Sequence, residues 1–582
     1  MWYYLIIILY SFLSTRGPRA ADAADAADAA DTADALAPAV ALNMRAASVS
    51  FLLALQVVSR LITFVLNTAL ARGLGPQWYA LANVQFQLVS GSVLFLAKEG
   101  VRRACQRMYP GGGGSVLAHG MNLAWLAVPI AFVAALLVGG YAGRRDSTDS
   151  SEASLVPNDE YMHAVWTVCA AGVLEAAAEP GWVYAQANDL IGRRVIAEGV
   201  AVVVRAVATL WFALWLQLGA RAFGYAQLLY AVAYVGLLHA LLRAHTPLHL
   251  LRPRRALAGS DHGGKAATAA TSAVWLPSAH LAITKQYCWQ SAQKYVLTEG
   301  ERLVLVRLSP LAQQGVFAKV TDLGSLVARL VLQPCEEAAF AHFSQAAAAR
   351  ALDLRVLQQL HALLRAAAIF GGLFLSFGPA YSWLLLHLLY GPKWSDTTAP
   401  TLLAAYCLHV CAMAINGIAE AFIYATASDE ELKALSRATA ALAALYLPAA
   451  VAGLHWLDSI GLVLTNWLNL LARIAYALAY IRRVRASVLA RHHASDEGAD
   501  AALRLLPHPA VLSALLIAAI VTGIAKLVLG APHHGWHAHA GHVAVGAASL
   551  CAVGLVTVRA EPELLIALRT ARRGGNAHKR ES

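Results

Sequence analysis

The chain contains 582 residues, of which 59% are hydrophobic and only 14% are charged. Soluble domains carry about 45–50% apolar and about 25% charged residues, so this composition excludes an ordinary soluble globular protein. The net charge of +11 fits either nucleic-acid binding or the charge bias of a membrane protein, and the positions of the basic residues decide between the two.

Residues 1–43 differ from the rest of the chain. An apolar run at 1–13 has no basic region before it, and the Ala-Asp-Ala repeat at 20–35 offers nothing to pack in a core. A regular membrane sequence begins at Met44. We therefore expect 1–43 to be a low-complexity extension, for which a mis-assigned start codon is preferred over a cleaved or disordered segment.

From Met44 onward, windows of about 20 mostly apolar residues recur, which is the length an α-helix needs to cross a bilayer. The pattern predicts an all-α polytopic membrane protein with about fourteen transmembrane helices. The expected spans are 48–71, 79–97, 119–141, 162–186, 195–217, 222–242, 281–301, 314–338, 361–382, 400–426, 434–455, 457–481, 510–530 and 541–558.

The longest connection between these spans divides them into six before it and eight after it. We expect two six-helix lobes around a central cavity, followed by two C-terminal helices. The expected parts are an N-lobe with spans 1–6 at 44–243, a cytosolic linker at 244–280, a C-lobe with spans 7–12 at 281–481, a basic cytosolic loop at 482–509, and spans 13 and 14 with a basic tail at 510–582.

Lys and Arg between the spans gather on one side of the predicted membrane. Such a bias marks the cytosolic side, so both termini are predicted to be cytosolic. Because the basic residues lie just outside the span ends and form no aromatic-interleaved platform, we expect no nucleic-acid binding. The opposite side holds only Arg72, Arg144, Arg145, Arg221, Arg302, Arg307 and Lys393.

Nine further Lys and Arg fall within the spans, where each costs about 2.5–3.5 kcal/mol at mid-bilayer unless it has a partner or a wet cavity. Polar residues recur at helical spacing on eight spans, either as contacts that hold the bundle or as the lining of a hydrophilic cavity. So many stripes favour a cavity with positive charge for an anionic headgroup such as a diphosphate. The nine are Arg60, Arg205, Lys285, Lys294, Lys319, Arg329, Arg365, Arg473 and Lys526.

Several motifs resemble those of the Rft oligosaccharide-translocation family of the endoplasmic reticulum. The most specific are TEGER at 298–302 and LGSLVAR at 323–329, which QPCEE follows at 333–337. QVVSRLITFVLN at 56–67, FLAKEGVRRAC at 95–105 and AINGIAE at 414–420 also match. The resemblance extends from about Met44 to the last span and implies the fold of the multidrug/oligosaccharidyl-lipid/polysaccharide exporter superfamily.

The resemblance implies a role in N-glycosylation, in which the dolichol-diphosphate-linked heptasaccharide is flipped from the cytosolic to the lumenal leaflet of the endoplasmic reticulum membrane. In that hypothesis Arg60, Arg329 and their neighbours hold the diphosphate. Glu336, Glu337 and Glu420 pair with them when the site is empty. The expected cavity residues are Arg60, Asn67, Arg72, Lys98, Glu99, Arg102, Arg103, Glu179, Arg194, Glu198, Lys285, Lys294, Glu299, Glu301, Arg329, Gln333, Glu336, Glu337, Asn416, Glu420 and Arg473.

Other functions remain as alternatives. A non-transporting scaffold for lipid-linked oligosaccharide in the same pathway is the main one, and an ion-coupled drug exporter or a membrane glycosyltransferase is a weaker one. We expect a transporter rather than an enzyme, with a dolichol-diphosphate oligosaccharide and membrane lipids as its partners. We expect no cofactor and no metal site, and treat the histidines at 533–542 as a solvated turn rather than a zinc site.

Overall fold

The structure is a computed structural model of the chain. It describes residues 64–108, 114–142, 156–188, 190–243, 252–253, 255–257, 273–348, 352–492, 506–530 and 535–562. The extension at 1–43, most of the span expected at 48–71 and its Arg60 lie outside the described residues.

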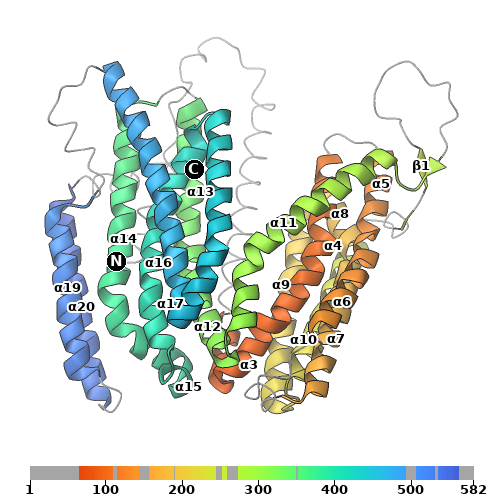
Figure 1. The fold of residues 1–582 in the computed structure, drawn as a ribbon, viewed down its shortest axis with the longest axis horizontal. Coiled ribbons are helices and arrows are strands. Elements are labelled where there is room, and N and C mark those ends of the chain that lie inside the picture. Colours follow the sequence, from red (N-terminus) through yellow and green to blue (C-terminus); the bar gives the residue numbers. More distant parts are fainter. Residues whose placement is uncertain are drawn as a thin grey trace, which may run out of the picture. The chain divides into compact units, whose positions relative to one another are not determined.

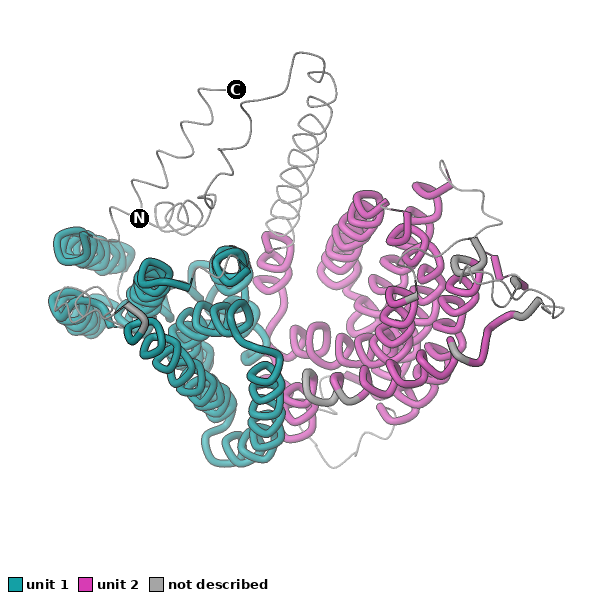
Figure 2. The backbone as a smooth tube through the Cα atoms, turned by 90° about the horizontal axis from the view of Figure 1, so that it is seen from above, with its two compact units in different colours: residues 1–27, 316–582 teal, residues 28–315 magenta. Residues whose placement is uncertain are grey.

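The chain forms two compact units, which Figure 2 shows in different colours. Unit 2 contains the described residues up to Gly315, and unit 1 contains those from Val316 onward. The boundary falls within helix α12 (Leu311–Val327), whereas the sequence analysis placed the division between lobes in the linker at 244–280. The expected six-plus-six division stays a prediction.

Unit 2 is a bundle in which α4, α6, α7 and α10 pack against one another and α11 packs along α4 (Figure 1). Alanine and valine side chains such as Val93, Ala97, Ala131 and Val165 fill the space between these helices. Its helices are α3 (Pro76–Ala80), α4 (Phe86–Met108), α5 (Gly114–Trp125), α6 (Ala127–Ala142), α7 (Asn158–Ala176), α8 (Glu179–Ala187), α9 (Ile191–Leu210), α10 (Arg221–Arg243) and α11 (Ser278–Leu308), with π-helical turns η1 (Leu81–Gln85) and η2 (Trp211–Trp215).

The predicted cytosolic linker contains a small antiparallel ribbon. Its two strands, β1 (Ala256–Leu257) and β2 (Ala273–Val274), pair Ala256 with Val274 and Leu257 with Ala273. Asn122 of α5 donates a hydrogen bond to the carbonyl oxygen of Trp275, just after the second strand, at 2.6 Å. The end of the linker is therefore attached to the helices of unit 2.

Unit 1 is organised around α14 and α16, which pack along each other, while α13 and α17 contact α16 (Figure 1). The last two helices form a pair that contacts α14. The helices of unit 1 are the remainder of α12, the π-helical turn η4 (Ala328–Leu332), α13 (Gln333–Ala348), α14 (Leu354–Tyr390), α15 (Pro392–Ser395), α16 (Ala399–Thr426), α17 (Asp429–His492), α19 (Pro509–Leu529) and α20 (Trp536–Ala560).

Helix α17 is a hairpin of two helical legs. The helical backbone is interrupted at Asp458, which has φ 51° and ψ −145°. Thr465 donates a hydrogen bond back to the carbonyl oxygen of Ala449, and a Cβ added to Gly461 would overlap the carbonyl group of Gly453. The spans expected at 434–455 and 457–481 are these two legs, joined with almost no loop.

Ten helical stretches within the described residues are long and apolar enough to cross a membrane. The hairpin α17 counts as one of them, so these ten account for eleven of the predicted spans. The spans predicted at 281–301 and 314–338 fall on α11 and on α12–α13, which are not among the ten. The chain is therefore a polytopic helical membrane protein, and the count of fourteen spans stays a prediction.

Candidate functional site

The most buried charges of unit 2 form a cluster between α4, α7 and α8. The carboxylate of Glu179 is fully buried and accepts two hydrogen bonds from Arg102, Nε to Oε2 at 2.7 Å and Nη2 to Oε1 at 2.6 Å. Lys98 lies one turn before Arg102 and binds Glu175 at 2.8 Å, with Glu179 at 3.5 Å. Two cations therefore match two carboxylates, which compensates the cost of burying each charge.

Aromatic contacts extend this cluster toward α9. The guanidinium of Arg102 lies 4.3 Å from the centre of the Trp182 ring, and that of Arg194 lies 4.7 Å from the same ring. Arg194 also donates a hydrogen bond to Gln186 at 2.8 Å. Trp182 thus contacts two arginines through cation–π interactions, and nothing in the polar stripes of the sequence singled it out.

A more exposed set of charges connects α4 with α11. Glu99 accepts a hydrogen bond from Arg103, one turn later on the same helix, at 3.0 Å. Lys294 of α11 places its Nζ 3.8 Å from the same carboxylate oxygen of Glu99. This pairing brings together three residues that the sequence analysis assigned to a common site.

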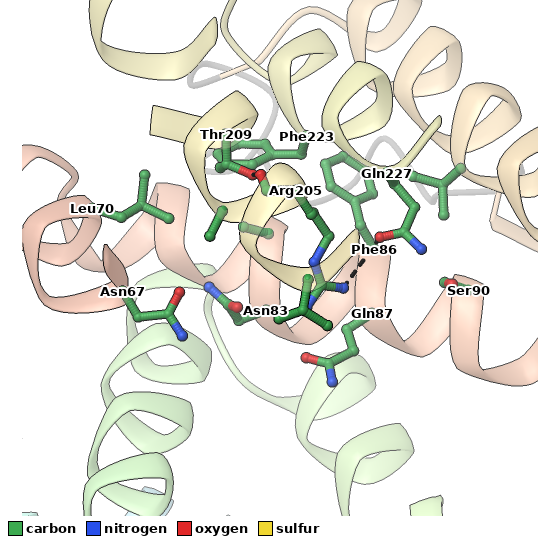
Figure 3. A pocket seen from close by; sticks show the side chains of 14 residues that line it. Asn67, Leu70, Asn83, Phe86, Gln87, Ser90, Arg205, Thr209, Phe223 and Gln227 are labelled. Atoms are coloured by element: carbon green, nitrogen blue, oxygen red, sulfur yellow. Dashed lines mark hydrogen bonds between the residues drawn. The ribbon is translucent and has the colours of Figure 1, made fainter. Parts of the chain in front are cut away.

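A polar pocket of about 110 Å³ lies in unit 2 between the helical segment at 64–73, η1–α4, α7, α9 and α10. Figure 3 shows that Arg205 reaches from α9 toward the side of the pocket where Asn83 and Gln87 lie. Its guanidinium donates a hydrogen bond to Gln227 of α10 at 3.2 Å. Polar residues of the first, second and fifth predicted spans therefore line one pocket. Helix α10 adds Gln227, which the sequence analysis did not name.

Unit 1 contains its own ion pair between α16 and α17. Arg473 donates to both carboxylate oxygens of Glu420, at 2.7 and 2.6 Å. Asn416 lies one turn before Glu420 and is buried, and a Cβ added to the neighbouring Gly417 would overlap the carboxylate of Glu336 on α13. Glu336, Asn416, Glu420 and Arg473 therefore gather at the meeting of three helices.

One of the eight polar stripes steps by 3, 4, 4 and 3 residues through Asp322, Ser325, Arg329, Gln333 and Glu336, which predicts a single helical face. The structure does not keep these residues on one face. The turn η4, which contains Arg329, is π-helical, and residues after a π turn do not continue the α-helical face of those before it. Arg329 accordingly hydrogen-bonds back to Ser325 at 2.7 Å, while Gln333 bonds forward to Glu337 at 2.9 Å. The expectation of a single face was wrong because the spacing rule assumes a regular α-helix.

Several expected cavity residues lie apart from these clusters. Lys285 on α11 and Glu198 on α9 are exposed, as is Arg72, which precedes α3. Glu299 pairs with Arg302 on its own helix at 3.0 Å, and Glu301 is half-buried nearby. Arg60 lies outside the described residues, as does most of its span.

Two further polar contacts were not foreseen. Arg365 of α14 and Glu561, just after α20, are both buried and lie 3.5 Å apart. The predicted last span ended at residue 558, so Glu561 was not considered as a partner for Arg365. His539 and His542 are buried, and their rings contact Trp383 and Tyr381 at 5.5 and 4.2 Å. The expectation of a solvated turn was wrong for these two histidines, because α20 begins at Trp536 and packs them against α14.

Metal coordination finds no support in the part of the chain that the structure describes. No group of three or more His, Cys, Asp or Glu side chains is placed there to hold a metal ion.

Several known proteins are similar to this chain over most of its length. Residues 44–570 match the family model described as Rft protein. Two similar relatives are the Man(5)GlcNAc(2)-PP-dolichol translocation proteins of Mus musculus, 32% identical over 89% of this chain and 95% of the relative, and of Xenopus tropicalis, 30% identical over 90% and 95%. The solved structure of the lipid II flippase MurJ in an inward closed conformation matches 88% of this chain and 99% of the MurJ chain. Its TM-score of 0.54, at 8% sequence identity, shows a shared fold.

Proposed function

Because this chain belongs to the Rft protein family, we propose that it translocates a dolichol-diphosphate-linked oligosaccharide across the endoplasmic reticulum membrane. The observation that carries the proposal is the match over nearly the whole membrane region to relatives named as Man(5)GlcNAc(2)-PP-dolichol translocation proteins. The chain is thus a transporter of lipid-linked oligosaccharide rather than an enzyme, and it supports protein N-glycosylation.

The diphosphate of such a lipid requires cations inside an otherwise apolar protein. Arg329 meets this requirement because its side chain is exposed in a turn between two helices of unit 1. A guanidinium binds phosphate oxygens through two parallel hydrogen bonds, which a lysine cannot do. We assign diphosphate binding to Arg329, while the polyprenyl tail stays in the surrounding lipid.

The orientation of the protein follows from its basic residues. The cytosolic side is the one on which Lys and Arg gather between the spans, which places both termini in the cytosol. The buried cluster around Glu179 then lies toward the cytosolic ends of its helices, and the pocket around Asn83 lies toward the lumenal ends. Glycosylation tags placed in the loop at 143–155 and in the tail after 562 test this topology, because only the lumenal tag is modified.

The charge reversal Arg329→Glu tests the assignment of the diphosphate site. We expect it to abolish the support of N-glycosylation in cells that lack the native protein, at normal protein abundance. Arg243→Glu is the matched control, because Arg243 is an exposed arginine at the end of α10 and is not among the expected site residues. Full glycosylation with Arg329→Glu at normal abundance contradicts the assignment.

A scaffold that presents lipid-linked oligosaccharide to the next enzyme is the second candidate. It uses the same binding residues but moves no headgroup across the bilayer. Liposomes that contain the purified protein and a labelled lipid-linked oligosaccharide separate the two. Catalysed flip-flop supports the translocator, whereas no flip-flop from protein that fully rescues glycosylation in cells supports the scaffold.

A further inference from the structure

The pocket of unit 2 has a lining that differs from the ion clusters described above. Four amide side chains contribute to it, and each offers two N–H donors and one carbonyl acceptor. Two hydroxyl groups, Ser90 and Thr209, and one cation, Arg205, make up the rest of the polar wall that the described residues form. The amides are Asn67, Asn83, Gln87 and Gln227.

Much of this hydrogen-bonding capacity is unused. Asn67, Gln87 and Ser90 have no side-chain hydrogen bond among the described residues. Asn83 makes only a long bond of 3.4 Å to the carbonyl oxygen of Tyr79. Gln87 is exposed, and Asn67 and Asn83 are half-buried, so these amides are available to a ligand or to water. Ser90 is 9% exposed and lines the same wall.

Arg205, the cation among the pocket residues that the structure describes, is already engaged. The Arg205 guanidinium donates to Gln227 at 3.2 Å and lies 5.3 Å from the centre of the Tyr230 ring. A diphosphate is bound best by several charge-assisted hydrogen bonds, and the described residues of this pocket offer one guanidinium for them. The wall therefore suits a neutral ligand with many hydroxyl groups better than it suits a diphosphate.

The apolar part of the pocket supports the same conclusion. Phe86 and Phe223 line it, and their ring centres lie 6.1 Å apart. A pyranose ring has hydroxyl groups around its edge and C–H groups on its faces, so it needs both amides and apolar carbon nearby. The π-helical turn η1 places Asn83 at this wall, where a regular helix would present a different face.

We propose that this pocket binds one hexose residue of the glycan, as a subsite separate from the arginines that hold the diphosphate. The proposal rests on the function proposed above and names which chemical part of that substrate unit 2 recognises. Its amides distinguish a glycosylated lipid from the bare lipid diphosphate, so the pocket provides selectivity for the sugar.

Binding of two water-soluble, short-chain polyprenyl lipids to the purified full chain tests the proposal. One carries the diphosphate with the mannose-containing heptasaccharide, and the other carries the diphosphate alone. We expect the double variant Asn83→Ala/Gln87→Ala to weaken binding of the glycosylated lipid about tenfold, as the loss of one or two hydrogen bonds predicts. Binding of the bare lipid should not change.

Gln106→Ala is the matched control, because Gln106 is an exposed amide on the same helix outside the pocket. If the double variant fails to fold, Gln87→Ala alone gives the same comparison, with an expected loss of about threefold from the single hydrogen bond. Gln87 is exposed, so this change leaves the packing of α4 intact.

Two outcomes overturn the subsite and leave the proposed function standing. In one, the variant binds the glycosylated lipid as tightly as the wild-type protein does. In the other, it loses equal affinity for both lipids, which makes the pocket a diphosphate site. If the wild-type protein binds neither lipid, the proposed function itself fails.

Discussion

Replacing Glu179 with Gln tests whether the buried cluster of unit 2 stabilises the fold. The change keeps the shape of the side chain but removes the charge that Arg102 and Lys98 face at 2.6 and 3.5 Å. Removing one partner of a buried ion pair costs about 3–5 kcal/mol. Because Lys98 retains Glu175, and the Arg102 side chain is 26% exposed, we expect the lower end, about 3 kcal/mol.

The free energy of unfolding of purified protein in lipid–detergent micelles, measured by SDS titration, checks this value. Glu99→Gln is the matched control, because its carboxylate is 29% exposed and pairs with Arg103 on the same helix, so we expect a loss below about 0.5 kcal/mol. In the double variant Glu179→Gln/Arg102→Gln, the losses should be less than additive. Wild-type stability of Glu179→Gln, or strict additivity, refutes the reasoning.

Two further changes probe packing between helices. Arg473→Lys should lower the free energy of unfolding in the same titration by about 1–2 kcal/mol, because a lysine cannot make both hydrogen bonds to Glu420. If Arg473→Lys loses as much stability as Arg473→Leu, the two-bond explanation is wrong. Gly315→Ala should cost about 1–3 kcal/mol, because its Cβ would overlap the carbonyl oxygen of Pro76. Gly91→Ala is the control: open space surrounds Gly91, so this change should be neutral or slightly stabilising. Equal thermal stabilities of the two variants would refute the predicted clash.

The position of the membrane helices was largely predictable from the sequence. Long apolar windows identified α4, α6, α7, α9, α10, α14, α16, α19 and α20, and both legs of α17. Hydropathy measures how favourably a segment transfers from water into lipid, and these helices are apolar enough for that transfer. Hydropathy does not report which helices touch, so α11 was assigned to the second lobe although its contacts in the structure are with α4.

The candidate site was predictable as a set of charges but not as a set of pairs. Lys98 and Glu175 are separated by 77 residues and meet only through the packing of α4 on α7. Glu420 binds Arg473, and Glu337 accepts a hydrogen bond from Gln333, which the spacing of these residues in the sequence did not predict. Helical periodicity gives the face of a residue, whereas its partner depends on the neighbouring helix.

The π-helical turns explain the remaining difference. Two of them, at η1 and η4, carry Asn83 and Arg329. Such turns occur often at functional sites and have no reliable signature in hydropathy or in polar spacing.

The abrupt reversal at Asp458 fixes the rotational register of the second leg of α17. Each residue of an α-helix turns the chain by about 100°, so one residue inserted after Asp458 would rotate everything beyond it by that angle. Arg473 would then face away from Glu420, although every side chain of the pair remained in the sequence. The number of residues between Asp458 and Arg473 therefore matters as much as their identity. We expect a deletion or insertion there to be more damaging than most substitutions.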